Sequence, residues 1–348
     1  MDNIIFKHGG IDVGKRRGIV DFSANINPLG LPLAIKKALS SNVDGALHYP
    51  QPWAERLVKK ISEYFGVNKN NVLVANGSTE LIYLVMRLYR PKTTLIPVPT
   101  FTEYERAASS VRSKVRFINI HEGENFKLPL SMLEKNRADA LFLCNPNNPT
   151  GNLLYDSPKY IKRLRHGLIV VDEAFMDFLP TQNEHTIMRE ALKNKRIVAI
   201  RTLTKFFALP GLRIGYIVAH KDTIAKLKAC LPPWNINFFA QLAAELILIN
   251  NGYIKKTYTI MQKERSFLFS QLNSIRGMRP YPSVANFILI RLTHRWPPSH
   301  RLKGLLLKKR ILVRDCSNFR NLSNRFIRVA VRSHKENLGL LRALKEVS

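Results

Sequence analysis

The chain has 348 residues, 45% of them hydrophobic, which is enough to bury a sizeable core in a large domain and a smaller one. It contains no run of about 18 apolar residues, so no segment is expected to span a membrane. Its three cysteines, Cys144, Cys230 and Cys316, are far apart and match neither a disulfide framework nor a zinc-binding spacing. We therefore expect no metal site and a reducing, cytoplasmic environment.

The formal net charge is +30, because 55 Lys and Arg residues stand against 25 Asp and Glu residues. A charge of this size raises the question of nucleic-acid binding. The basic residues are spread through the chain, however, and form neither a basic tail nor a recognisable nucleic-acid-binding module. We therefore favour a basic surface, which would also attract anionic substrates, over a function in binding nucleic acid.

Strand-like and helix-like segments alternate through the middle of the chain. The strand-like segments are VLVAN (72–76), TLIPV (94–98), ALFLCN (140–145), LIVVDEA (168–174), RIVAIRT (196–202) and IGYIVA (214–219). Helical patterns such as TELIYLVMRLY (79–89) lie between several of them. This alternation predicts a mostly parallel sheet with helices on both faces.

The last third of the chain has a different pattern. Residues 236–275 predict a helix-rich stretch that is broken near Asn250, and a strand (285–292), a helix (302–310) and a strand (326–331) follow. We expect an N-terminal arm (1–30) that contributes to the small domain and the substrate site, a large domain (31–240) and a small α+β domain (241–348).

A lysine and an arginine lie eight residues apart in the segment TLTKFFALPGLRIGY (202–216). Lys205 directly follows a strand-like segment and has apolar neighbours, so we expect its amine to point into a pocket. Burial lowers the pKa of an amine and makes it a nucleophile towards an aldehyde. Arg213 lies between two apolar residues, where its charge would be matched by an anion such as phosphate. Most such pairs are surface charges, so this segment gains its meaning from the motifs that accompany it.

Asp172 stands at the carboxyl end of a nearly continuous apolar strand (168–172). In open α/β sheets, ligands bind at this end of the strands. A carboxylate buried there needs a cationic partner, and a protonated pyridinium nitrogen would be one. The carboxylate would in turn keep the nitrogen protonated, so that the ring accepts electrons from a carbanion at the substrate Cα. Equally, Asp172 would cap the helix that follows.

Two loops add further polar groups. CNPNNPTG (144–151) predicts a rigid turn, in which Asn148 either only completes the turn or donates a hydrogen bond to the phenolic oxygen of a cofactor. NGSTE (76–80) leads from a strand into a helix. Gly77, Ser78 and Thr79 either cap this helix or offer backbone N–H groups and hydroxyls to an anion.

Taken in order, NGSTE, NPNNPTG, VVDEAF and TLTKFFALPGLRIGY resemble the motifs of the fold-type I enzymes that use pyridoxal 5'-phosphate (PLP), the aminotransferase superfamily. The likeness extends over nearly the whole chain, and four motifs in the same order argue against coincidence. The resemblance implies an α/β fold in which a mostly parallel seven-stranded sheet lies between helices, next to a smaller α+β domain. It also implies a homodimer with its sites at the subunit interface.

The resemblance further implies roles for particular residues. Lys205 would carry PLP as a Schiff base and Asp172 would pair with the pyridinium nitrogen, which makes these two the catalytic residues. Asn148 would contact the phenolic oxygen, and Phe101 would stack on the pyridine ring. Tyr49 would reach the cofactor phosphate of the neighbouring subunit. The phosphate cup would be formed by Gly77, Ser78, Thr79, Thr202, Thr204 and Arg213.

Within this superfamily the chain resembles the L-threonine-O-3-phosphate decarboxylases more closely than the histidinol-phosphate aminotransferases. The resemblance rests on HGG (8–10) ahead of DFSANINPLG (21–30), on Phe175 where the aminotransferases usually have tyrosine, on the lysine segment, and on RDCSNFRNL (314–322). Ile11 departs from the pattern, because asparagine is expected after HGG. The implied reaction converts L-threonine O-3-phosphate to (R)-1-amino-2-propanol O-2-phosphate and CO2 in cobalamin biosynthesis. The alternative is a histidinol-phosphate aminotransferase or a related class I/II aminotransferase.

Decarboxylation and transamination differ in which substrate bond is held perpendicular to the cofactor ring. The residues that hold the anionic groups of the substrate therefore choose between the two reactions. By resemblance these residues are His8, Gly9, Asn25, Asn148, Arg314 and Arg328. A histidine near a terminus is otherwise usually solvated, and Arg314 also belongs to a basic stretch. Lys205, a water or a tyrosine would return a proton to Cα. Phosphothreonine, phosphoserine and histidinol phosphate all present suitable anions.

Overall fold

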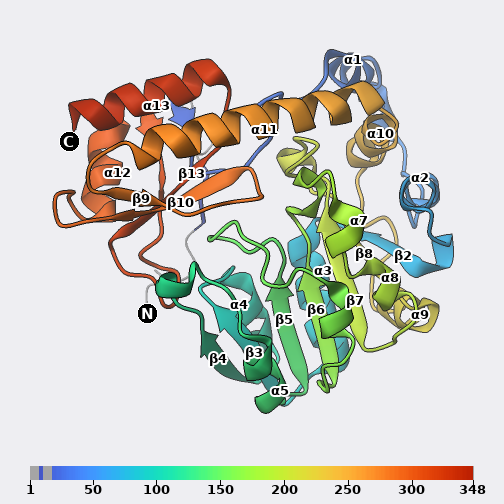
Figure 1. The fold of residues 1–348 in the computed structure, drawn as a ribbon. Coiled ribbons are helices and arrows are strands. Elements are labelled where there is room, and N and C mark those ends of the chain that lie inside the picture. The colour runs from blue at the N-terminus through green and yellow to red at the C-terminus, as the bar shows by residue number, and fades with distance from the viewer. Residues whose placement is uncertain (1–7, 11–17, 348) are drawn as a thin grey trace.

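The computed structural model describes residues 8–10 and 18–347, so Ile11 lies outside the described residues. A seven-stranded sheet in the order β2-β8-β7-β6-β5-β3-β4 forms the centre of the larger part of the molecule (Figure 1). Strands β4, β3, β5, β6 and β7 are mutually parallel, whereas β8 is antiparallel to both of its neighbours. The predicted sheet is thereby confirmed. Its strands are β2 (Val72–Ala75), β3 (Thr93–Val98), β4 (Lys114–Asn119), β5 (Ala140–Cys144), β6 (Leu168–Asp172), β7 (Ile197–Thr202) and β8 (Gly215–Ala219).

The central strands of this sheet are buried on both sides, and apolar side chains therefore point to both of its faces. In β5, Leu141 and Leu143 join one hydrophobic cluster while Phe142 and Cys144 join the other. Apolar side chains of α3, α4 and α9 cover the second face, and those of α2, α5 and α8 belong to the first cluster. These helices are α2 (Glu55–Phe65), α3 (Ser78–Tyr89), α4 (Glu103–Ser110), α5 (Leu130–Lys135), α8 (Met188–Ala191) and α9 (Lys221–Lys228).

The smaller part of the molecule contains a four-stranded antiparallel sheet in the order β12-β13-β10-β9. Its strands are β9 (Met278–Pro280), β10 (Phe287–Leu292), β12 (Arg314–Asp315) and β13 (Phe326–Ala330). A separate pair joins the N-terminal segment to this part, since β1 (Val20–Asp21) runs parallel to β11 (Ile311–Leu312). Residues from the beginning and the end of the chain therefore lie side by side.

The helix-rich stretch is broken where the sequence predicts it. Helix α10 (Phe238–Ile247) ends before Asn250, and the Asn250 side chain accepts a hydrogen bond of 3.0 Å from the Tyr253 N–H to cap the long helix α11 (Asn251–Asn273). Helix α11 runs from α10 across to the small sheet (Figure 1). The remaining helices are α1 (Leu33–Ser41), α6 (Pro158–Ile161), α7 (Gln182–His185), α12 (Ser299–Lys308) and α13 (His334–Glu346). In the part of the chain that the structure describes, none of the helices has the length and apolar content of a membrane span.

Candidate active site

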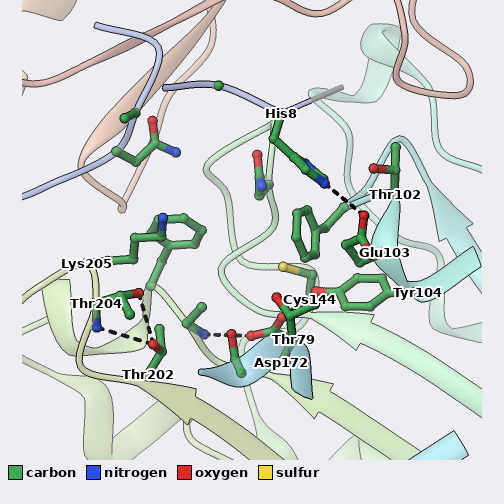
Figure 2. A pocket seen from close by; sticks show the side chains of 18 of the residues that line it. His8, Thr79, Thr102, Glu103, Tyr104, Cys144, Asp172, Thr202, Thr204 and Lys205 are labelled. Atoms are coloured by element: carbon green, nitrogen blue, oxygen red, sulfur yellow. Dashed lines mark hydrogen bonds and ion pairs between the residues drawn. The ribbon is translucent and has the colours of Figure 1, made fainter. Parts of the chain in front are cut away.

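A cavity of about 450 Å³ lies at the carboxyl ends of β5, β6 and β7 and is also lined by residues of the small sheet and the N-terminal segment (Figure 2). Its position agrees with the rule that open α/β sheets bind ligands at this edge. Most of the predicted site residues line it, although they come from distant parts of the sequence. They are His8, Gly9, Asn25, Ser78, Thr79, Phe101, Asn148, Asp172, Thr202, Thr204, Lys205, Arg213, Arg314 and Arg328.

Lys205 and Asp172 both face this cavity (Figure 2). Burial, together with the charges of Arg328 and Arg213, lowers the pKa of Lys205 to about 8. Burial raises the pKa of Asp172 to about 6, although a hydrogen bond from Tyr104 opposes the increase. Among the described residues no cation forms an ion pair with Asp172. The cavity therefore contains an amine that is readily deprotonated and a carboxylate that lacks a cationic partner.

The loop before α3 and the loop after β7 form one cradle. Gly77 does not itself line the cavity, but it lies behind Arg213: its φ is +89°, and a Cβ there would overlap the Arg213 guanidinium. The hydroxyls of Thr202 and Thr204 lie 2.9 Å apart, and Thr202 donates to the Ile214 carbonyl at 2.8 Å. Ser78 and Thr79, the first two residues of α3, also line the cavity, and the start of a helix is suited to bind an anion.

Arg213 is exposed, although its apolar sequence neighbours suggested a buried charge. Arg213 adopts a φ of +58°, in the left-handed region, at the end of the turn Pro210–Leu212. Its side chain reaches Gly77 and lines the cavity from there. Its apolar sequence neighbours therefore do not bury Arg213, whereas its position at the cavity agrees with the expected one.

Arg314 and Arg328 stand directly opposite each other on β12 and β13. Both are buried, with relative exposures of 7% and 5%. Burial lowers the pKa of both arginines, that of Arg328 to about 10. Arg328 donates to the Asn148 side chain and, at 2.9 Å, to the Ser23 carbonyl, but its Nε has no partner among the described residues. Arg314 donates to Asn318 at 2.7 Å.

The N-terminal segment forms one wall of the cavity. His8 approaches Phe101 with a distance of 5.5 Å between ring centroids. Gly9 packs against the Ser23 carbonyl so closely that a Cβ would overlap it. Asn25 is 3% exposed, and its side-chain oxygen has no hydrogen-bond partner among the described residues. An unpartnered acceptor on a cavity wall is typical of a ligand contact.

Tyr49 lies outside the cavity. It is 85% exposed and its ring lies 5.2 Å from that of Trp234. The chain by itself therefore gives Tyr49 no role at its own site, and the role in a neighbouring subunit stays a prediction.

Several residues of the cavity were not predicted from the sequence, among them Ser23, Glu103, Tyr104, Arg106, Cys144 and Phe319. Tyr104 is the one for which a signal existed: it follows Phe101 by three residues at the start of α4, a spacing that places two side chains on one side of a helical turn. Ser23 and Phe319 lie within the motifs 21–30 and 314–322, but no role was predicted for either residue, because the pairing of distant segments brings them to the cavity.

Comparison with known proteins agrees with this geometry. Residues 17–344 match the family described as aminotransferase class I and II. The threonine-phosphate decarboxylase of Salmonella typhimurium is 37% identical over 94% of this chain and 91% of its own. Two solved structures superpose closely. Histidinol-phosphate aminotransferase from Clostridium acetobutylicum has a TM-score of 0.84 and 34% identity over 94% of this chain and 98% of its own. L-threonine-O-3-phosphate decarboxylase from Porphyromonas gingivalis has a TM-score of 0.82 and 31% identity over 94% of this chain and 99% of its own. The chain belongs to the aminotransferase class I and II family, and the predicted family and fold are confirmed.

Enzymes of this family depend on PLP, and the residues present here fit that cofactor. At position 77 the backbone has a φ of +89° and a Cβ would overlap the end of the Arg213 side chain, so a glycine there lets the guanidinium lie against the backbone, where it would hold a phosphate. Asp172 lacks a cation and would hold the pyridinium nitrogen, while Lys205 would bind the aldehyde. Phe101 and the hydroxyls of Ser78, Thr79, Thr202 and Thr204 complete the set of side chains suited to the ring and the phosphate.

Proposed function

We propose that this enzyme decarboxylates L-threonine O-3-phosphate, giving (R)-1-amino-2-propanol O-2-phosphate and CO2. The observation that carries the proposal is the buried cross-strand pair of Arg314 and Arg328. Like charges directly opposite each other destabilise a sheet, and burial increases the cost. An anionic ligand between them would remove that penalty. Phosphothreonine offers two anionic groups on one small molecule, a carboxylate and a phosphate.

The cationic groups around the cavity are suited to bind different anions, namely the phosphate of the cofactor and the carboxylate and phosphate of the substrate. Arg213, beside Gly77, is placed for the cofactor phosphate. Arg328 is held by Asn148 and the Ser23 carbonyl, which fixes the direction of its guanidinium and suits it to orient a carboxylate. Arg314, His8 and Asn25 are then left for the substrate phosphate.

When bound, PLP supplies an aldehyde for covalent attachment and a ring that accepts the electron pair of the broken bond. The residues of the chain do the rest. Asp172 would accept a hydrogen bond from the ring nitrogen and keep that nitrogen protonated. Arg328 would hold the carboxylate of the substrate and so orient the bond that breaks. Lys205 Nζ, with its lowered pKa, exchanges protons near neutral pH and returns one to Cα.

The reaction is tested by supplying the PLP-loaded protein with phosphothreonine and measuring CO2. We expect release without any keto acid, and no release from threonine, which lacks the phosphate. Phosphoserine and histidinol phosphate are compared in the same assay. A strict requirement for 2-oxoglutarate, with amino transfer from histidinol phosphate, would overturn the decarboxylase proposal in favour of the aminotransferase. We expect the product, (R)-1-amino-2-propanol O-2-phosphate, to be used in cobalamin biosynthesis.

We further propose that the enzyme is a homodimer. An exposed apolar surface surrounds α10 and contains Leu33, Val43, Leu47, Tyr49 and Trp234, which are between 47% and 85% exposed. Surfaces of this kind usually mark protein contacts. Mixing Lys205→Ala with Tyr49→Ala subunits tests both the dimer and the role of Tyr49. If Tyr49 serves the neighbouring site, hybrid dimers contain one intact site and regain activity, whereas no recovery after subunit exchange contradicts the proposal.

The cytoplasm is the proposed location. The three cysteines are free, and Cys144 and Cys316 are buried, so a reducing compartment suits them. Export to the periplasm of an expressed fusion, followed by thiol titration, would test whether an oxidising compartment impairs the protein.

A further inference from the structure

The active-site cavity is lined by several arginines, but it also contains the buried carboxylate of Glu103. The side chain of Glu103 is only 5% exposed, and it lines the cavity together with Arg106, Arg314 and Arg328. A negative charge in a cavity suited to anions would repel the substrate unless it is neutralised. Its position in the first turn of α4 favours an acidic residue, but Glu105 in the same turn faces Arg320 instead, so the helix does not explain where Glu103 points.

Both oxygens of this carboxylate accept hydrogen bonds from other elements. His8 Nε2 lies 2.8 Å from Oε1 (Figure 2), and the Tyr83 hydroxyl of α3 donates to Oε2 at 3.0 Å. Arg106 Nη1 lies 3.8 Å from Oε1 on the solvent side, and its own side chain is 52% exposed. Glu103 therefore ties the N-terminal segment to a framework made of α3 and α4.

The segment is also held at a second point. The Gly10 N–H donates to the Ser23 hydroxyl at 2.8 Å, and Gly9 packs on the Ser23 carbonyl. The same carbonyl accepts from Arg328. Residues 8–10 thus bridge Glu103 on one side of the cavity and Arg328 on the other.

This arrangement fixes which ring nitrogen of His8 is free. Burial would raise the pKa of Glu103, but the hydrogen bonds from His8 and Tyr83 outweigh it, and the pKa lies below its usual value. An ionised carboxylate only accepts hydrogen bonds, so Nε2 carries the hydrogen that it donates. Nδ1 is then the ring nitrogen that remains for a ligand, and it donates a hydrogen bond to an anion in the ring form that carries a hydrogen on both nitrogens.

We infer that Glu103 is a positioning residue that holds His8 against the cavity and thereby sets the affinity for the anionic group of the substrate. The inference rests on the proposed function for the identity of that substrate. Glu103 acts through His8 and does not itself touch the substrate. Arg106, Arg314 and Arg328 line the same cavity and keep it favourable for anions despite the charge on Glu103.

A double-mutant cycle on the PLP-loaded enzyme tests this coupling. Glu103→Gln keeps the shape of the side chain and removes its charge, and we expect KM for phosphothreonine to rise about tenfold with kcat changed less than about threefold. In a His8→Ala background the same substitution should change KM less than about twofold, because the group that it positions is gone. Tyr83→Phe removes one bond and should raise KM by about threefold. Cofactor retention should be unchanged in all three variants.

Glu105→Gln is the matched control, because it removes the same charge from the same helical turn outside the cavity, and its KM should change less than about twofold. Equal effects of Glu103→Gln with and without His8 would overturn the inference, as would a fall in kcat with loss of PLP. Competition by inorganic phosphate, measured as a binding constant, reports on the same cycle independently of the reaction. If the wild type transaminates histidinol phosphate instead, the cycle run with that substrate still tests Glu103 while the proposed function alone fails.

Discussion

The hydroxyl of Tyr104 donates a hydrogen bond of 2.7 Å to Asp172 Oδ2, and the Ala174 N–H donates to Oδ1 at 3.0 Å. Tyr104 is fully buried and stacks on Phe142, with centroids 5.0 Å apart and an interplanar angle of 7°. The carboxylate is therefore held by one rigid side chain and one backbone group. Two donors fix its plane and leave lone pairs for a third partner in the cavity.

Removing this hydroxyl should weaken the hold on the cofactor. In Tyr104→Phe the pKa of Asp172 rises further above about 6, because the hydrogen bond that opposes burial is lost. We expect PLP to bind about tenfold more weakly, in line with about 1.5 kcal/mol for a hydrogen bond to a charged group. Fluorescence titration of the apoprotein with PLP measures it. Tyr155→Phe is the control, because the buried Tyr155 hydroxyl has no hydrogen-bond partner among the described residues; equal affinities in both variants would contradict the role given to Tyr104.

The amine of Lys205 should become reactive near pH 8. Its pKa is lowered to about 8, so the neutral nucleophilic form is scarce below that pH and predominant above it. The rate at which the apoprotein takes up PLP covalently should rise with pH and level off above about 8. Stopped-flow absorbance follows the reaction, and Lys205→Ala should give no band while its circular dichroism stays native. A midpoint near 10 would mean that the amine is solvated.

Gly77 should tolerate no side chain. A Cβ at this position overlaps Arg213, and the backbone has a φ of +89°, which L-residues adopt at a cost of about 1 to 3 kcal/mol. Gly77→Ala should displace Arg213 and weaken PLP binding at least about tenfold. Gly211→Ala provides a comparison in the segment that carries Arg213, since a Cβ at Gly211 meets no atom within 4 Å. Equilibrium dialysis distinguishes them, and unchanged retention of PLP by Gly77→Ala would exclude the proposed cradle.

A buried ion network behind the site should dominate the stability of the large sheet. Arg201 is fully buried and donates to Glu173 and Asp177, both at 2.9 Å. Arg201→Met leaves two carboxylates buried without their cation, which should cost about 3 to 5 kcal/mol of unfolding free energy. Lys195→Met breaks an exposed pair with Asp222, which solvent screens, and should leave the urea midpoint nearly unchanged. Urea unfolding of both apoproteins gives the comparison, and similar midpoints would disprove it.

The strands of the large sheet and the motifs at their ends could be predicted from the sequence, because each is a pattern of neighbouring residues. A strand buried on both faces is a continuous apolar run, and the motifs at 76–80, 144–151 and 202–216 each stand at the end of such a run. The edge strand β4 was missed because its residues, KVRFIN, are largely half-exposed and interrupted by charges. The domain boundary at residue 240, which falls within α10, stays a prediction.

By itself the sequence determined the family and the cofactor, and it predicted that Lys205 and Asp172 meet at one cavity, since both stand at the carboxyl ends of neighbouring parallel strands. Only the tertiary structure decided what surrounds them. The pairing of β12 with β13 places Arg314 opposite Arg328, and the path of residues 8–10 places His8 on Glu103, 95 residues away. These contacts depend on how distant segments pack, and no local periodicity encodes them. The physical reason is that the register between strands and the burial of side chains, rather than composition, decide which charged residues lie next to each other.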